Sequence, residues 1–157
     1  SFDMADKGVT HSLAEKLNIG SYRVLHPVNA DGSGYGGIGE ITPVNIIEYA
    51  KFVKKTLETD FLRLFCKGDE IVKRVAYCGG SGSEFIEDAI RQGAQVYITG
   101  DIKYHQAQEA IKNNLCIIDA GHYITEIHSL ETIRKALVKR GLDVISFKKN
   151  IAEEKII

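Results

Sequence analysis

The second half of the sequence alternates short apolar segments with longer amphipathic ones, and this alternation limits the folds open to the chain. Such a pattern predicts parallel strands joined by right-handed helical crossovers. The expected strands span residues 75–78, 95–99, 115–119 and 142–147, and the expected helices span 84–92, 105–113 and a segment ending near Arg140. Because the strands are continuously apolar, helices should cover both faces of the sheet. The sequence therefore predicts an α/β fold, a layered sandwich around a largely parallel sheet.

The first half should add a short helix, one strand, a second and longer helix, and then two more strands. Thr10 can cap a short helix that runs through Leu17 and stops at Gly20. Thr42-Pro43 has the cap and first-turn residues of the longer helix, whose apolar stripe runs from Ile46 to Leu57. The three strands are expected at residues 22–28, 61–66 and 72–78, and residues 29–34 have turn chemistry.

Length and composition indicate one soluble domain over residues 1–157. A net charge of −1 argues against a large electrostatic footprint for nucleic acid or anionic lipid, and no apolar run is long enough to span a membrane. The first residues lack the basic and apolar parts of a signal peptide. Cys66, Cys78 and Cys116 are widely spaced in apolar sequence, so we expect reduced, buried thiols and a cytoplasmic protein.

Ligands of a parallel sheet gather at the carboxyl ends of its strands, which directs attention to three loops, and the third is the most informative. His122 and Glu126 stand four residues apart where an expected strand passes into a helix, so they share one helical face. An imidazole and a carboxylate suit zinc, iron or manganese, and a bridging carboxylate suits a two-metal site. The alternative is a solvated pair that only supports the helix.

The other two loops carry weaker signals. Asp101 and His105 follow the strand that ends at Thr99, but the acid can equally cap the next helix and the imidazole can be an ordinary surface residue. The segment Gly79, Gly80, Ser81 and Gly82 lies between a strand and a helix, where backbone N–H groups can bind an anion. It matches neither a dinucleotide nor a Walker motif, and a tight turn needs glycine anyway. Cys78 beside it is either a nucleophile or, with no histidine near it in sequence, a core residue.

These segments together resemble a known family. Tyr97-Ile-Thr-Gly-Asp-Ile-Lys-Tyr-His105 and Ile118-Asp-Ala-Gly-His-Tyr-Ile-Thr-Glu126 resemble the signature of the Nif-three-like dinuclear metal-centre proteins, often catalogued as GTP cyclohydrolase I type 2 homologues. Val75-Ala-Tyr-Cys-Gly-Gly-Ser-Gly82 and Gly36-Gly-Ile-Gly-Glu40 resemble its glycine loop and its mid-chain segment. Phe2-Asp3, followed by Gly8-Val9 and Leu13-Ala14, resembles a further family stretch.

The resemblance implies a role for several residues. Asp3 and His122 match metal ligands, and Glu126 matches the glutamate that bridges two divalent ions (zinc, iron or manganese). His105 matches a histidine at the rim of the site, which is either an acid/base residue or a residue that supports the metal ligands. An adjacent histidine pair that the family carries upstream has no counterpart here, which favours a C-terminal portion of a longer protein. Gln106 stands where relatives commonly have aspartate, which puts the orienting partner of His105 in doubt.

Two functions fit this resemblance. The first is a metal-dependent hydrolase, as in the catalogued GTP ring opening, in which the ions lower the pKa of water and a small anionic substrate binds at the glycine loop. His105 would then carry the proton. The alternative is a non-enzymatic ring-forming scaffold or regulatory binder with structural metals. The resemblance also implies a toroidal homo-oligomer, as a hexamer, while the net charge makes nucleic acid an unfavourable partner for this segment.

Overall fold

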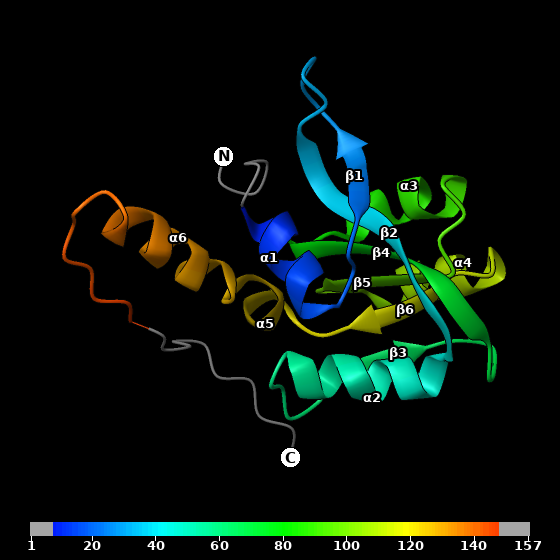
Figure 1. Cartoon of the computed structure of the whole chain (residues 1–157). Coiled ribbons are helices and arrows are strands. Elements are labelled where there is room, and N and C mark those ends of the chain that lie inside the picture. The colour runs from blue at the N-terminus through cyan, green and yellow to red at the C-terminus, as the bar shows by residue number, and fades with distance from the viewer. Residues whose placement is uncertain (1–7, 148–157) are drawn as a thin grey trace.

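The computed structural model describes residues 8–147, in which helices flank a six-stranded sheet (Figure 1). The strands are β1 (Tyr22–Pro27), β2 (Gly34–Asn45), β3 (Arg63–Phe65), β4 (Ile71–Ser81), β5 (Val96–Gly100) and β6 (Cys116–Asp119). The helices are α1 (Val9–Lys16), α2 (Ile46–Thr56), α3 (Ile86–Arg91), α4 (Tyr104–Lys112), α5 (His122–Glu126) and α6 (Ser129–Val138), with a single 3-10 turn at Ser83–Phe85 before α3.

The sheet has the order β1-β2-β4-β5-β6-β3 and combines parallel and antiparallel pairing. Its centre is parallel, since β4 pairs with β5 and β5 with β6, and the crossovers between them contain α3 and α4. The outer pairs are antiparallel: β1 with β2, β2 with β4, and β3 with β6. The α/β alternation of the second half is thus confirmed, and the parallel part consists of its three central strands.

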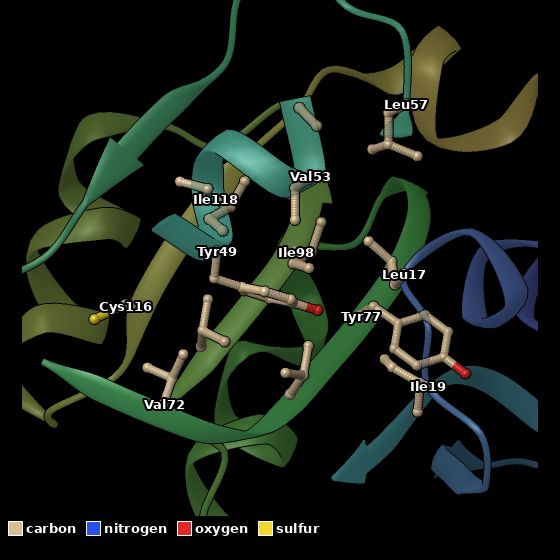
Figure 2. Packing of buried hydrophobic residues seen from close by; sticks show 14 of the residues in the cluster. Leu17, Ile19, Tyr49, Val53, Leu57, Val72, Tyr77, Ile98, Cys116 and Ile118 are labelled. Atoms are coloured by element: carbon tan, nitrogen blue, oxygen red, sulfur yellow. The ribbon is translucent and has the colours of Figure 1, made fainter. Parts of the chain in front are cut away.

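Two apolar clusters, one on each face of the sheet, explain why the central strands are apolar throughout. On β5, Ile98 belongs to the cluster beneath α1 and α2, while its neighbour Tyr97 belongs to the cluster beneath α3 and α4. Ile118 and Ile117 alternate in the same way on β6. Figure 2 shows the first of these clusters, in which side chains from α1, α2 and the sheet pack together. Burial on both faces fixes the register of β5 and β6, because a shift by one residue would exchange the two sets.

The region around Thr42 and Pro43 is a strand, so the prediction that these residues open a helix was wrong. Both lie in β2, whose pairing with β4 is irregular between Glu40 and Val44. An irregularity of this kind tolerates proline, which cannot donate a ladder hydrogen bond. The helix begins at Ile46 instead, and the Asn45 side chain caps it by accepting a hydrogen bond from the Ile47 amide at 2.8 Å.

The ends of the other expected helices also needed correction. Thr10 lies inside α1, whose N-cap is Gly8, and Asn18 adopts the left-handed conformation after the helix in place of Gly20. The helix expected to run to Arg140 is divided into α5 and α6 by a turn at residues 127–128. Sequence periodicity passes through that turn because apolar residues keep a helical spacing on both sides of it.

No strand forms at residues 142–147, contrary to the sequence prediction. Ile145 is 94% exposed and Phe147 is 80% exposed. The described sheet ends at β1 and β3, and the edge of β6 is already occupied by β3. Alternating apolar residues form a strand only where they pair with a neighbouring strand, and the sequence does not reveal that β3, not residues 142–147, pairs with β6.

The three cysteines are free thiols, as expected, but only Cys78 and Cys116 are buried, whereas Cys66 is half-buried. Cys66 directly follows β3, an edge strand of the described sheet. Among residues 8–147, no helix has both the length and the apolar character needed to cross a membrane.

Candidate metal centre

Three loops meet where the parallel strands end, as the sequence predicts. Asp101 follows β5, and His122 begins α5 two residues after Ala120, which leaves β6. The end of β4 lies beneath α5, because the amide of Gly80 donates a hydrogen bond to Thr125 Oγ1 at 2.9 Å. The carboxyl ends of β4, β5 and β6 therefore surround one site.

Asp119 holds two of these loops in place. Its carboxylate accepts hydrogen bonds from the amides of Ile102, at 2.9 Å, and Gly121, at 3.0 Å. It also pairs with Arg63 of β3, whose guanidinium donates to the carbonyl of Ile102 at 2.9 Å. Because its side chain is only 4% exposed and fully engaged, Asp119 positions the loops and is not free to bind a ligand.

His122 lies between two carboxylates. Its Nδ1 is 2.8 Å from Asp101 Oδ2, and its Nε2 is 3.4 Å from Glu126 Oε2. The hydrogen bond to Asp101 is the main cause that raises the pKa of the His122 imidazole, and the charge of Glu126 acts in the same direction. When Nδ1 carries the proton it donates to Asp101, and the lone pair of Nε2 then faces Glu126. All three side chains are between 42% and 54% exposed, so the group is open to solvent.

Asp101, which the sequence shows as an acid at a strand end, is paired by the structure with His122. Its alternative role, capping the next helix, is excluded because the N-cap of α4 is Lys103, whose amide donates to Gln106 Oε1 at 2.9 Å. Asp101 itself adopts a left-handed backbone with φ of 58°. Such a conformation is unusual outside glycine and is enriched at functional sites. The hydrogen bond from the Lys103 amide shows that the Gln106 side chain caps the start of α4 and does not orient His105.

The glycine segment is less available to an anion than its sequence suggests. Its first part belongs to β4, and the amides of Gly80 and Gly82 donate to the buried hydroxyls of Thr125 and Thr99. Tyr97 closes the segment by donating to the carbonyl of Gly82 at 2.8 Å. These two amides are therefore not directed at a ligand. Anion binding by Gly79, Gly80, Ser81 and Gly82 stays a prediction, and any such site would have to use the other two amides.

Gly80 has a different structural reason to be glycine. Its φ is +70°, and a Cβ at this position would overlap the Glu126 carboxylate and come within 3.2 Å of His122 Nε2. The neighbouring Gly79 is also close, since a Cβ there would lie 3.6 Å from Glu126 Cγ. The end of β4, at Gly79 and Gly80, thus packs directly against the Glu126 side chain.

The remaining sequence-predicted residues are not brought into this group. His105 lies exposed on α4, and its side chain makes no hydrogen bond or ion pair with another residue that the structure describes. Asp3 lies outside the described residues. Within residues 8–147, no three His, Cys, Asp or Glu side chains are gathered so as to hold a metal ion. His122 and Glu126 alone therefore represent the expected ligands in this part of the chain.

Known proteins resemble this chain in sequence over most of its length. The model of the family described as DUF34/NIF3 (NGG1p interacting factor 3) matches residues 1–152. This chain belongs to that family. Its relatives include the "GTP cyclohydrolase 1 type 2 homolog" of Streptococcus pneumoniae, 39% identical over 131 residues, which cover 81% of this chain and 49% of that protein. A protein of the same name from Nostoc is 36% identical, over 80% of this chain and 49% of its own length.

A solved structure agrees with the fold. The Bacillus cereus protein related to NIF3 superposes with a TM-score of 0.86 at 19% identity, over 99% of this chain and 71% of that one. At this identity the likeness concerns the fold alone. The chain spans about half the length of the curated DUF34/NIF3 relatives described above.

Proposed function

We propose that His122 and Glu126 are ligands of a divalent metal centre in a metal-dependent hydrolase, with Asp3 as a further ligand. The relatives named as GTP cyclohydrolase 1 type 2 homologues support the reaction class, since ring opening of that kind is a hydrolysis. The substrate class we propose is a small anionic molecule. The following observations support the metal site in this chain.

The spacing of the two donor atoms carries the proposal. His122 Nε2 and Glu126 Oε2 are 3.4 Å apart. Two ligands at about 2.1 Å from a tetrahedral zinc ion are separated by roughly 3.4 Å, and slightly less in an octahedral site. The two atoms thus already have the separation that a shared cation requires. An imidazole and a carboxylate also form a donor set suited to zinc, iron or manganese.

The chain's own residues would prepare such a site in two ways. Asp101 holds the imidazole by Nδ1, the arrangement that fixes the tautomer and orientation of metal-binding histidines. The Thr125 hydroxyl links α5 to the end of β4. It accepts a hydrogen bond from the Gly80 amide and donates one to a backbone carbonyl at the start of α5. His105 is the proton carrier in this proposal. A bound divalent cation would supply Lewis-acid chemistry and lower the pKa of water.

Replacing Asp101 by alanine is expected to weaken metal binding by about 10- to 100-fold, because the imidazole loses the partner that orients it. The measurement is a competition titration against a chromogenic chelator, with zinc and with manganese. Asp88→Ala is the matched control, since Asp88 Oδ2 lies at the same 2.8 Å distance from Nδ1 of His26, elsewhere in the fold. Equal metal affinities of the two variants would contradict the orienting role of Asp101.

The decisive experiment uses the full-length protein as its gene encodes it. Metal content and hydrolysis of GTP, simple amides and phosphoesters would be measured after loading with zinc, iron or manganese. The same measurements on His122→Ala with Glu126→Ala test the ligands: full metal content in this double variant would overturn the assignment. Bound metal without turnover of any substrate, together with loss of assembly in the variant, would instead favour a scaffold with structural metals.

A further inference from the structure

The pairing of β3 with β6 brings Cys66, the residue after β3, near Cys116, the first residue of β6. In this antiparallel pair Arg63 lies opposite Asp119, Leu64 opposite Ile118, and Phe65 opposite Ile117. One step further in the same register places Cys66 opposite Cys116, the first residue of β6. The two cysteines are fifty residues apart in the sequence, so only the sheet topology makes them neighbours.

Both side chains also lie on the same face of the sheet. Cys116 belongs to the cluster beneath α1 and α2, and Figure 2 shows it there with Ile118 of the same strand. Cys66 packs against this cluster, as does Leu64, whereas the intervening Phe65 packs on the opposite face. The two thiols therefore lie on the same face of the sheet. Cys78, by contrast, belongs to the cluster on the other face.

The electrostatics of the two thiols agree with this proximity. Burial raises the pKa of the Cys116 thiol to about 12, and Glu70 and Cys66 add to the effect. Burial and the charges of Glu70 and Asp69 likewise raise the pKa of Cys66. Both thiols are consequently protonated at neutral pH and react slowly, since the thiolate is the reactive form.

We propose that Cys66 and Cys116 form an oxidative modification site, at which a peroxide converts the two thiols into an intramolecular disulfide that ties β3 to β6. Residues directly opposite in an antiparallel pair have Cα atoms about 4.5–5.5 Å apart, within the range of roughly 4.4–6.8 Å that a disulfide spans. Their Cβ atoms need to approach by only about 1 Å. A three-residue edge strand such as β3 can accommodate that movement.

The reaction proceeds in two steps and needs only a peroxide. The half-buried Cys66 sulfur attacks the peroxide, the O–O bond breaks, and a sulfenic acid and one water form from hydrogen peroxide. The Cys116 sulfur then attacks Cys66 Sγ, forming the S–S bond as the S–O bond breaks and a second water leaves. The two sulfur atoms together lose the two electrons that reduce the peroxide. The raised thiol pKa makes this a response to sustained oxidant and not a rapid one.

The test is thiol counting and peptide mapping of the reduced chain before and after prolonged exposure to hydrogen peroxide at pH 8. We expect two of the three thiols to disappear, a mass loss of about 2 Da, and a linked peptide pair that contains Cys66 and Cys116. The oxidised chain should also melt several degrees higher, because the bond constrains the unfolded state. Reduction with a phosphine should reverse both changes.

Variants distinguish this disulfide from other oxidation products. Cys66→Ser should abolish the linked peptides, and its half-buried position makes it the variant least disruptive to folding. Cys78→Ser is the matched control and should form the disulfide normally. The proposal is overturned by three intact thiols after exposure, by single cysteines oxidised to sulfinic acid without a disulfide, or by a disulfide that links two chains.

Discussion

Gly80→Ala is expected to lower the metal affinity of the protein at least about 100-fold while costing only about 1–2 kcal/mol of folding free energy. The added methyl group would overlap the Glu126 carboxylate and crowd His122 Nε2. The carboxylate is the end of a flexible side chain, so it can swing aside without disturbing the fold. It would then lose its 3.4 Å spacing from the imidazole, on which shared metal binding depends.

The cost in stability comes from the backbone. Gly80 has φ of +70°, a conformation that any residue with a Cβ adopts at a cost of about 1–2 kcal/mol. Gly32→Ala is the matched control, because Gly32 has φ of +83° with open space around its Cβ position, in the turn between β1 and β2. Urea unfolding in the presence of a chelator should give similar losses for the two variants. Chelator competition should separate them, and equal metal affinities would contradict the proposed role of Gly80.

The contrast between these glycines shows what the sequence could reveal about the site. His122 and Glu126 were identifiable because a spacing of four residues places two ligand types on one helical face. The role of Gly80 was not identifiable from the sequence. The side chain that leaves no room for a Cβ there is that of Glu126, on α5, forty-six residues later in the chain. Asp101 was visible as an acid at a strand end. Its partner became evident only from the adjacency of β5 and β6.

The fold shows the same division between local and distant causes. The alternation over β4, β5 and β6 was predicted because each of these strands is apolar on both faces, a property written in consecutive residues. The helix start predicted at Thr42-Pro43 was wrong because these residues suit a helix start locally, whereas the pairing of β2 with β4 keeps them in a strand. Residues 142–147 misled for the converse reason, since their pattern suits a strand but β3 occupies the edge beside β6.

Gly100→Ala is expected to have the largest effect on folding of any single methyl addition near the site, about 2–4 kcal/mol. A Cβ at Gly100 would lie 2.6 Å from both Gly121 C and His122 N. These are backbone atoms at the start of α5, and they cannot move aside as a flexible side chain can. The loop after β6 is also held by Asp119, which accepts from the Gly121 amide and pairs with Arg63. The methyl group must therefore displace either the end of β5 or this anchored loop.

Urea unfolding with Gly20→Ala as the control measures this effect. Gly20 has open space at its Cβ position and no left-handed backbone, so its substitution should leave the free energy of unfolding within about 0.5 kcal/mol of the original. If the loop yields, Gly100→Ala moves His122 away from Asp101, and metal affinity falls together with stability. If the end of β5 yields, Asp101 moves with it because it directly follows Gly100, so the contact with His122 is again disturbed and metal affinity also falls. An unchanged free energy of unfolding would contradict the close approach of β5 to α5, on which the geometry of the whole site depends.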